Sequence, residues 1–435
     1  MFVRRIAVVG TGYVGLTTGA CLASLGHRVV CADVDALKVA RLRAGQVDIL
    51  EPDLADLVAR GRSAGRLNFV EGARYAVADA EVVFLCLPTP MGAGGAADLS
   101  AVEAVAGEIR DVLPRGAVVV CKSTVPVGTS TRVAALLGRD DVAVVSNPEF
   151  LREGSAVRDF LHPDRIVVGA DSPRAAERVA ALFAKLGAPT VLMDAASAEM
   201  VKYAANCFLA MKLSYVNAVA ELCELVGADV ASVTEGMGHD RRIGQSFLRP
   251  GPGWGGSCLP KDTHAMVRIA EAVGVDFSLV KATIETNGRQ QRRVVDKLRA
   301  AVGTLAGRRI GVLGLAFKAG TDDLRDSPAL AVAELLAFEG AELVAHDPQV
   351  DRPLVGMTVV GDPYAAVRGA DAVVLLTDWP EFRSLDWARV ADGMTGSTVL
   401  DTRDHLDPDA LHRAGLVLLG LGREPARDVA AVRAR

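Results

Sequence analysis

Short apolar runs alternate with longer amphipathic stretches through the N-terminal part of the chain. The runs fall at residues 5–9, 28–32, 82–87, 117–122, 142–146 and 165–169. Continuous apolar runs of this length are typical of strands that are buried on both faces of a parallel sheet. The stretches between them predict covering helices. The pattern therefore predicts a doubly wound α/β domain of the Rossmann type over residues 1–196.

A long helix is predicted next, over residues 197–226, ending before Gly227. Apolar residues recur at positions 201, 204, 205, 208, 209, 213, 216 and 219, which is an amphipathic pattern. Residues 263–302 also predict helix, so residues 197–305 are expected to form a central helical region. A helix this long between two α/β lobes is a natural dimer surface, and we expect a homodimer.

A second α/β domain, Rossmann-like in its order of elements, is predicted over residues 306–422, with strands at 309–313, 342–345, 372–376 and 398–400. Its first turn, GVLGLA at residues 311–316, lacks the GxGxxG spacing. It is therefore not expected to be a second dinucleotide site. Residues 423–435 are charged and alanine-rich, and they predict a frayed tail.

Composition excludes several classes of function. The net charge is −5 with no basic block, which argues against nucleic acid as a partner. The start, MFVRRIAVVG, runs straight into a strand, unlike a signal peptide, and no apolar run is long enough to span a membrane. The seven cysteines are odd in number and lack CxxC spacing, so we expect a cytoplasmic protein without disulfides or a metal site.

A glycine turn follows the first predicted strand. Gly10, Gly12 and Gly15 form GxGxxG, and Asp33 ends the next strand, 23 residues after the first glycine. Such glycines permit a tight turn and let a pyrophosphate reach the N-terminus of the following helix. The carboxylate of Asp33 suits ribose hydroxyls and disfavours a 2′-phosphate, so NAD is expected rather than NADP. The alternative is a doubly wound domain without a ligand.

Polar clusters stand at the ends of the later predicted strands. Thr89, Thr124, Glu149 and Glu153 follow three of them. Ligands of such sheets bind beyond the carboxyl ends of the strands, so these residues are candidates for a cofactor or substrate site. Taken singly, each is equally well explained as a turn or cap residue.

Two polar residues lie one turn apart on the long helix. Lys202 and Asn206 share a face of a mostly buried helix, where polar groups need a partner. A cation and an amide donor side by side suit the stabilisation of a developing oxyanion. The alternative is a lysine that reaches solvent beside a satisfied amide.

The stretch FLRPGPGWGGSCLPKD, residues 247–262, predicts a tight loop whose bare backbone approaches a ligand. Cys258 stands near its end, followed by Lys261 and Asp262, a setting that favours a thiolate nucleophile. The alternative is a structural cysteine in a surface turn. Beyond a later strand, Lys318 and Arg325 suit phosphate groups, although basic residues on an exposed loop are commonly just solvated.

The motifs GTGYVG, LPTP, STVPVG, NPEFLREG, KYAAN, GxGxGGSCLPKD and FKxxTDDLRxSP occur in the order and spacing of one family. Over roughly residues 3–420, the chain resembles the UDP-glucose/GDP-mannose dehydrogenase family. The resemblance implies an NAD domain, a dimerisation region and a nucleotide-sugar domain. It also implies oxidation of a sugar C6 alcohol to a carboxylate with two NAD. The NPEFLREGSAVRDFLHPDRIVVG segment favours UDP-glucose, with GDP-mannose or an N-acetylated UDP-sugar as alternatives.

The resemblance also implies roles for individual residues. The catalytic set comprises Cys258 as nucleophile, Lys202 and Asn206 for the oxyanion, and Thr124, Glu149, Glu153 and Asp262 for acid–base chemistry. Expected cofactor contacts are Gly10, Gly12, Tyr13, Val14, Gly15, Asp33, Lys38, Thr89, Thr124, Glu153, Lys261 and Arg325. Expected substrate contacts are Phe150, Leu151, Arg152, Glu153, Lys202, Asn206, Arg242, Phe247, Leu248, Arg249, Pro250, Gly251, Gly255 and Lys318. Among them, Arg242 matches the family arginine that reaches the substrate of the neighbouring subunit.

Two other functions fit part of the pattern. A single-step NAD dehydrogenase of β-hydroxyacids would share the N-terminal and helical domains, but it would leave Cys258 and the second α/β domain without a purpose. A non-catalytic NAD-binding protein would bind cofactor without turnover.

Overall fold

The computed structural model describes residues 3–423 of the chain. These residues form two compact units. Unit 1 comprises Met1–Ala205 and His264–Val275, and unit 2 comprises Asn206–Thr263 and Asp276–Arg435. Helices α9 (Ala195–Val226) and α11 (Leu259–Ala272) each begin in one unit and end in the other. Of the tail predicted over residues 423–435, only Arg423 lies within the described residues, where it pairs with Asp229 and Asp404.

Unit 1 contains an eight-stranded sheet in the order β3-β2-β1-β4-β5-β6-β7-β8. Neighbouring strands are parallel except β6 and β7, which are antiparallel. The strands are β1 (Arg5–Val9), β2 (Arg28–Asp33), β3 (Leu67–Glu71), β4 (Val82–Leu85), β5 (Val118–Cys121), β6 (Ala143–Ser146), β7 (Ile166–Gly169) and β8 (Thr190–Met193). The reversal of order at β1 and β4 places a switch point beside the glycine turn, where ligands of doubly wound sheets bind.

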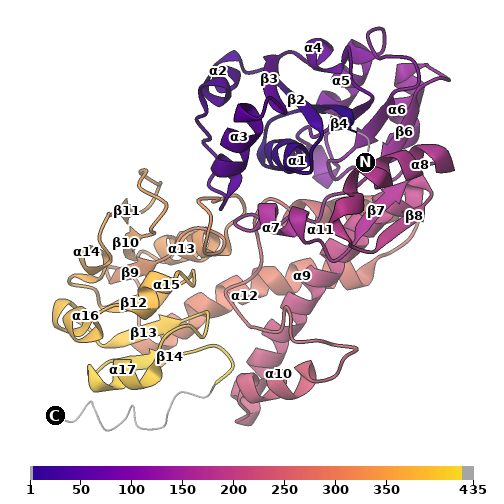
Figure 1. Ribbon diagram of the computed structural model, residues 1–435. Coiled ribbons are helices and arrows are strands. Elements are labelled where there is room, and N and C mark those ends of the chain that lie inside the picture. The colour runs from indigo at the N-terminus through magenta and orange to yellow at the C-terminus, as the bar shows by residue number, and fades with distance from the viewer. Residues whose placement is uncertain (1–2, 424–435) are drawn as a thin grey trace. The chain divides into compact units, whose positions relative to one another are not determined.

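Helices cover both faces of this sheet (Figure 1). One face carries α1 (Tyr13–Ser24), α2 (Ala36–Ala44), α3 (Leu54–Ser63), α7 (Ala156–Leu161) and α8 (Pro173–Ala180). The other face carries α4 (Ala73–Val77), α5 (Ser100–Ile109) and α6 (Thr129–Leu137). Two short 3₁₀ helices, η1 (Ala93–Gly95) and η2 (Ala181–Leu186), complete the unit.

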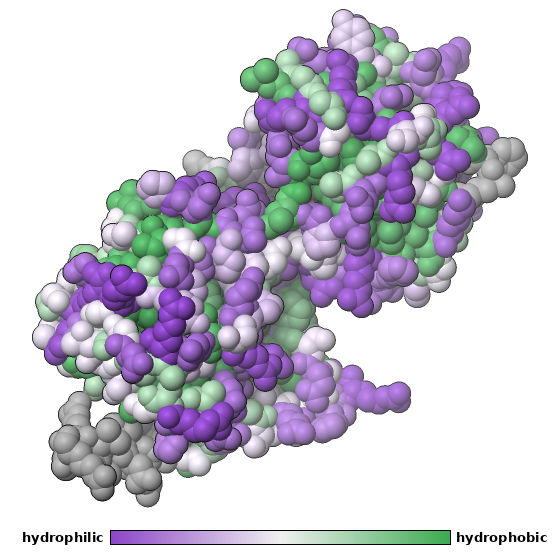
Figure 2. All heavy atoms as spheres, turned by 60° about the vertical axis from the view of Figure 1, so that its left-hand side comes forward, coloured by the Kyte–Doolittle hydropathy of each residue, from purple (hydrophilic) through white to green (hydrophobic). Residues whose placement is uncertain are grey.

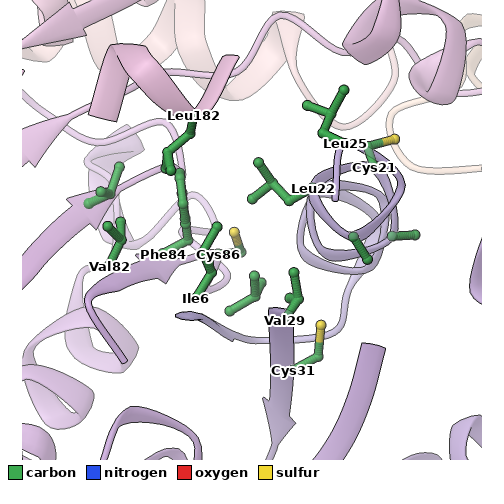
Figure 3. Close-up of a cluster of buried hydrophobic side chains, with 14 of the residues drawn as sticks. Ile6, Cys21, Leu22, Leu25, Val29, Cys31, Val82, Phe84, Cys86 and Leu182 are labelled. Atoms are coloured by element: carbon green, nitrogen blue, oxygen red, sulfur yellow. The ribbon is translucent and has the colours of Figure 1, made fainter. Parts of the chain in front are cut away.

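The period of a strand explains why β1 is apolar throughout. Ile6 and Val8 belong to the core on the α1 face, whereas Ala7 and Val9 belong to the core on the α5 face. Figure 3 shows the first of these cores, with Ile6 and Phe84 from the sheet close to Leu22 of α1. Burial on both faces therefore requires the continuous apolar run that predicted the strand.

Unit 2 contains a six-stranded parallel sheet in the order β11-β10-β9-β12-β13-β14. Its strands are β9 (Arg309–Leu313), β10 (Glu342–His346), β11 (Thr358–Val359), β12 (Ala372–Leu375), β13 (Thr398–Asp401) and β14 (Val417–Leu419). One face carries α12 (Ser278–Val302) and α13 (Pro328–Phe338), and the other carries α14 (Pro363–Val367), α15 (Pro380–Arg383), α16 (Trp387–Gly393) and α17 (Pro408–Arg413). Helix α10 (Val230–Gly238) follows α9.

The turn after β9 differs from the glycine turn of unit 1, as the missing GxGxxG spacing predicted. The buried carboxylate of Asp347, at the end of β10, accepts hydrogen bonds from the backbone N–H groups of Leu315 and Ala316 at 2.7 and 2.9 Å. These amides are therefore engaged by the protein itself.

The α/β fold predicted from the sequence is confirmed, with two differences in its elements. Strands β3, β8, β11 and β14 were not predicted, and the helix predicted over residues 263–302 is two helices, α11 and α12, with a break around Gly274. Figure 2 shows mostly hydrophilic side chains on the visible faces, with smaller hydrophobic areas among them. Within residues 3–423, no helix combines the length and apolar character that a membrane span requires.

Candidate active site

The glycine turn of unit 1 joins β1 to α1. Gly10 has a φ of +95°, which favours glycine, and a Cβ on Gly15 would lie 1.9 Å from the Gly10 carbonyl oxygen. The turn and the first helical turn are therefore in direct contact. Among residues 3–423, and apart from its own chain neighbours, no heavy atom lies within 4 Å of a Cβ placed on Gly12, the N-cap of α1. This open space beside a helix N-terminus fits the pyrophosphate of a dinucleotide.

Asp33, at the end of β2, is held in place by hydrogen bonds from the glycine turn. Its carboxylate accepts hydrogen bonds from the backbone N–H of Thr11 at 3.0 Å and from the Thr11 hydroxyl, and Lys38 Nζ lies 3.4 Å away. Burial raises the pKa of Asp33, but Thr11, Asp35 and Lys38 lower it, and the net shift is downward. An ionised carboxylate at this point is compatible with the ribose contact expected of Asp33. Thr11 was not predicted as a site residue.

Glu51, which was not predicted as a site residue, connects the start of α1 to the loop that carries Glu153. Its buried carboxylate accepts hydrogen bonds from the Tyr13 hydroxyl, from Gly154 N at 2.8 Å and from Val157 N at 3.2 Å. Burial and Glu51 raise the pKa of Tyr13, so its hydroxyl stays protonated. The predicted cofactor residue Tyr13 and the half-buried Glu153 therefore belong to adjoining segments of unit 1. Val14, on the other hand, packs against the α1-face core.

Two threonines connect the ends of β4 and β5. The Thr89 hydroxyl donates to the Thr124 carbonyl oxygen at 2.9 Å, and both residues are buried. The two predicted site residues are therefore brought together at the carboxyl edge of the sheet.

Glu149 and Lys202 form a buried ion pair in unit 1. Lys202 Nζ lies 3.0 Å from Glu149 Oε1, and the two side chains are 4% and 6% exposed. The other oxygen, Oε2, accepts the backbone N–H of Leu151 at 2.6 Å. Burial raises the pKa of Glu149, but Lys202, the Leu151 N–H and Lys122 lower it, and the net shift is downward. Glu149 is thus a buried, ionised carboxylate.

The predicted substrate segment 150–152 lies next to this pair. The Phe150 ring has the Arg165 guanidinium 3.5 Å and the Lys202 ammonium 5.5 Å from its centroid. Leu151 is half-buried against the α1-face core, and Arg152 is exposed and paired with Asp159. Arg165 was not predicted from the sequence.

In unit 2, Asn206 holds Asp262. Asn206 Nδ2 donates to Asp262 Oδ2 at 2.6 Å, and Lys261 Nζ lies 2.6 Å from Asp262 Oδ1. The Asp262 side chain is fully buried. Lys202 and Asn206 lie one turn apart on the continuous helix α9, as predicted, but their observed partners differ. Lys202 pairs with Glu149, and Asn206 binds Asp262.

Cys258 directly precedes α11, and its carbonyl oxygen accepts the Asp262 N–H at 3.0 Å. The thiol is half-buried, 3.6 Å from Ser257 Oγ. The prediction that Lys261 and Asp262 lie in a loop is wrong, because both residues belong to the first turn of α11. A cysteine at a helix N-terminus is in a position that favours the thiolate.

The cysteine loop is anchored within unit 2 by a tryptophan. Trp254 Nε1 donates to Ser214 Oγ of α9 at 2.9 Å, and the Trp254 backbone exchanges hydrogen bonds with the Asn287 side chain of α12. Gly251 N donates to Asn217 Oδ1 at 2.8 Å. In the preceding segment, Leu248 and Pro250 are buried, Arg249 is exposed, and Phe247 has a φ of +63°. The loop therefore has a defined backbone.

The bare glycines of this loop meet protein rather than open space. A Cβ on Gly255 would lie 1.9 Å from the Asp326 carbonyl oxygen, and one on Gly256 would lie 2.7 Å from the Phe317 ring. Packing against protein is thus sufficient to require glycine at both positions. They let the cysteine loop pack against residues 317–328, the segment that carries Lys318 and Arg325.

The remaining predicted basic residues have protein partners. Arg325 pairs with Asp323, and Lys318 Nζ lies 5.8 Å from the centroid of the Phe317 ring. Arg242 pairs with Asp240 and is 89% exposed. Arg403, which was not predicted, donates from Nε to the Leu376 carbonyl and lies beside Gly251. In the described part of the chain, no group of three or more residues has the arrangement of a metal site.

Three consecutive segments match parts of one known family. Residues 4–187 match "UDP-glucose/GDP-mannose dehydrogenase family, NAD binding domain". Residues 196–289 match its "central domain", and residues 311–408 match its "UDP binding domain". The prediction of an N-terminal NAD-binding domain is therefore confirmed.

Individual relatives match over nearly the whole chain. The UDP-glucose 6-dehydrogenase TuaD of Bacillus subtilis is 43% identical over 434 residues, covering 98% of this chain and 94% of TuaD. The structure of a UDP-glucose dehydrogenase from Pyrobaculum islandicum matches with a TM-score of 0.87 at 41% identity, covering 93% of this chain and 95% of that one. A UDP-D-ManNAc dehydrogenase from Pyrococcus horikoshii matches with a TM-score of 0.86 at 30% identity, covering 96% and 99%.

Proposed function

The chain belongs to the UDP-glucose/GDP-mannose dehydrogenase family, and we propose that it oxidises UDP-glucose to UDP-glucuronate with two NAD. The observation that carries this proposal is the similarity to UDP-glucose dehydrogenases over nearly the full length, at 41–43% identity. The overall reaction converts a C6 alcohol, two NAD and water to a carboxylate and two NADH, releasing protons. A buried ionised carboxylate and a cysteine at a helix N-terminus suit the two halves of this chemistry.

In the first oxidation, the protein must hold the substrate and remove the C6 hydroxyl proton. Glu149 is ionised and buried, and Thr124, Glu153 and Asp262 are the other candidates to move this proton through an ordered water. The glycine turn and Asp33 would hold NAD, which would supply the hydride acceptor for each oxidation of C6. The further proposed cofactor contacts are Tyr13, Val14, Lys38, Thr89, Lys261 and Arg325.

In the second half, the Cys258 thiolate attacks the C6 aldehyde and forms a thiohemiacetal. Lys202 and Asn206, one turn apart on α9, stabilise its oxyanion. Loss of the second hydride leaves a thioester, which water hydrolyses to the carboxylate and the free thiol. The covalent bond retains the aldehyde between the two oxidations. The proposed substrate contacts are residues 150–153, 247–251 and 255, with Lys318 and the exposed Arg242.

The proposed homodimer rests on an apolar stripe of α9. Ala204, Phe208, Met211, Tyr215, Ala218, Leu222 and Leu225 follow one another at alternating spacings of four and three residues. Phe208, Tyr215, Leu222 and Leu225 are 57%, 55%, 58% and 79% exposed. This spacing is that of a coiled-coil seam, which a second copy of the helix would cover. We expect F208D/L222D to be monomeric by light scattering, and V355D, at a 97% exposed site, to remain dimeric.

A cytoplasmic location is proposed because the seven cysteines are all free and six of them are buried. Oxidising compartments would favour their pairing.

The deciding experiment measures NADH at 340 nm per limiting UDP-glucose with NAD in excess. Two NADH per sugar support oxidation to the acid, whereas one means that the reaction stops at the aldehyde. Cys258→Ser should bind both ligands but lose net turnover, and wild-type turnover by this variant would contradict the covalent mechanism. UDP-D-ManNAc and GDP-mannose serve as competing substrates, and a preference for either would overturn the choice of UDP-glucose.

A further inference from the structure

A buried lysine that the mechanism above does not use lies next to the Glu149–Lys202 pair. Lys122 directly follows β5 and is 5% exposed. Burying an ammonium group costs free energy unless the protein replaces its hydration. Lys122 Nζ donates to Asn147 Oδ1 at 3.1 Å, and Asn147 Nδ2 donates to the Val167 carbonyl at 2.7 Å. The amide is thereby oriented with its oxygen toward the lysine, so the site is built to hold this cation.

The surroundings of Lys122 are apolar, so its charge is weakly screened and acts on neighbouring titratable groups. The rings of Phe160 and Phe183 have their centroids 6.0 and 5.8 Å from its Nζ. The titratable groups that interact with it are Glu149, Cys86 and Lys202, from the β6 end, the β4 end and α9. Cys86 belongs to the buried core drawn in Figure 3. Burial lowers the pKa of Lys122 to about 8, against the opposing effect of Glu149.

Two ammonium groups, those of Lys122 and Lys202, interact with the single carboxylate of Glu149. The direct ion pair is the one between Lys202 and Glu149, at 3.0 Å. If the Lys202 ammonium stabilises an oxyanion on the substrate, it cannot at the same time fully neutralise the negative charge of Glu149. The carboxylate would then lie buried beside the newly formed negative charge, a costly arrangement.

We propose that Lys122 is a positioning residue that keeps Glu149 ionised and in place while Lys202 interacts with the substrate. The inference rests on the proposed function, in which Lys202 and Glu149 act on one substrate. Lys122 interacts with Glu149 and is held by Asn147, so its charge stays near the carboxylate when Lys202 interacts with the substrate.

The test compares the pH dependence of kcat in wild type, Lys122→Met and Lys122→Arg. Methionine keeps most of the length of the unbranched side chain and removes the charge. The acidic limb of the profile should move to higher pH by about one unit, the lower end of the effect of one nearby cation on a carboxylate. At a pH below both limbs, kcat should fall about tenfold. KM for both substrates should change less than about twofold, since the proposal gives Lys122 no ligand contact.

The arginine variant retains the charge and should keep the wild-type limb. Lys185→Met is the matched control, because it removes an exposed lysine of unit 1 that binds the Leu25 carbonyl. A purely structural role of Lys122 would lower the melting temperature but leave the limb in place, which would overturn the inference. If Lys122→Met does not fold, Lys122→Gln, which can still donate to Asn147, takes its place with the same expected shift. Absence of NAD-dependent oxidation in the wild type would instead contradict the proposed function.

Discussion

Replacing Lys202 by methionine measures how much the Glu149–Lys202 pair contributes to the stability of unit 1. The pair is 3.0 Å long, and its side chains are 4% and 6% exposed, so solvent screens it little. Breaking a buried pair costs about 3–5 kcal/mol, mostly because the remaining charge is left uncompensated. The carboxylate keeps the Leu151 N–H and the nearby charge of Lys122. We therefore expect the free energy of unfolding to fall by about 3 kcal/mol, at the lower end of this range.

The pH dependence of this loss has a definite sign. Glu149 has a lowered pKa in the folded protein, so its interactions stabilise the fold at pH values above its ordinary pKa, about 4.3. That contribution disappears as the pH falls through the folded-state value. The difference between wild type and Lys202→Met should therefore be complete at neutral pH and shrink below about pH 4.

The assay must report on unit 1. The three tryptophans, Trp254, Trp379 and Trp387, all lie in unit 2, so their fluorescence is blind to local unfolding around β5 and β6. Hydrogen exchange of the β5 and β6 amides in native conditions supplies the missing probe.

The control is the double variant Glu149→Gln/Lys202→Met, which removes both charges. It should be more stable than Lys202→Met alone, since no uncompensated charge remains. The reasoning would be refuted if the free energy of unfolding of Lys202→Met lay within about 0.5 kcal/mol of the wild-type value. It would also be refuted if the losses in Lys202→Met and in Glu149→Gln, measured singly, simply added in the double variant.

Three further predictions concern other parts of the site. Gly15→Ala should destabilise unit 1 by about 2 kcal/mol or more, because its Cβ would lie 1.9 Å from a carbonyl oxygen. Gly107→Ala, at a helical site of α5 with open space around the new Cβ, should stabilise the unit by about 0.5–1 kcal/mol. Thermal melts of the two variants must move in opposite directions. Asp33→Ala should weaken NAD binding tenfold or more, from the loss of charge-assisted hydrogen bonds worth about 1.5–3 kcal/mol, and should improve the relative affinity for NADP. Calorimetric titration with both cofactors checks this, and an unchanged NAD affinity would exclude the assigned role. Asn206→Ala removes the 2.6 Å hydrogen bond to the buried Asp262 and should lower the stability of unit 2 by about 1.5–3 kcal/mol. Tryptophan fluorescence in urea reports this unit directly, and an unshifted midpoint would contradict the prediction.

The elements missed from the sequence share a physical cause. Strand β8 has exposed residues at its first three positions, and β3 alternates buried and exposed positions at its start, so neither presents a continuous apolar run. Strand β11 has two residues and β14 has three, too few to show a period. The central strands were predictable because burial on both faces imposes a continuous run on their own residues.

The missed site residues are those whose partners lie far away along the chain. Glu51 binds Gly154, 103 residues later, and stands in a segment with no recognisable site pattern. Lys122 looks like the last residue of a strand, and Arg403 looks like one basic residue in a polar turn. Neither residue type nor spacing reveals such contacts, because a strand end meets its neighbours only when the sheet has assembled.

By itself, the sequence determined the fold class, the glycine turn with its carboxylate, and the presence of a cysteine among glycines and prolines. Each of these depends on a local pattern: apolar periodicity, backbone freedom, or a short motif. Only the tertiary structure decided which residues these polar side chains and glycines contact. It pairs Lys202 with Glu149, binds Asn206 to Asp262, and sets Gly255 against the Asp326 carbonyl. These contacts join segments that are distant in sequence, so burial and charge compensation in the packed units select them.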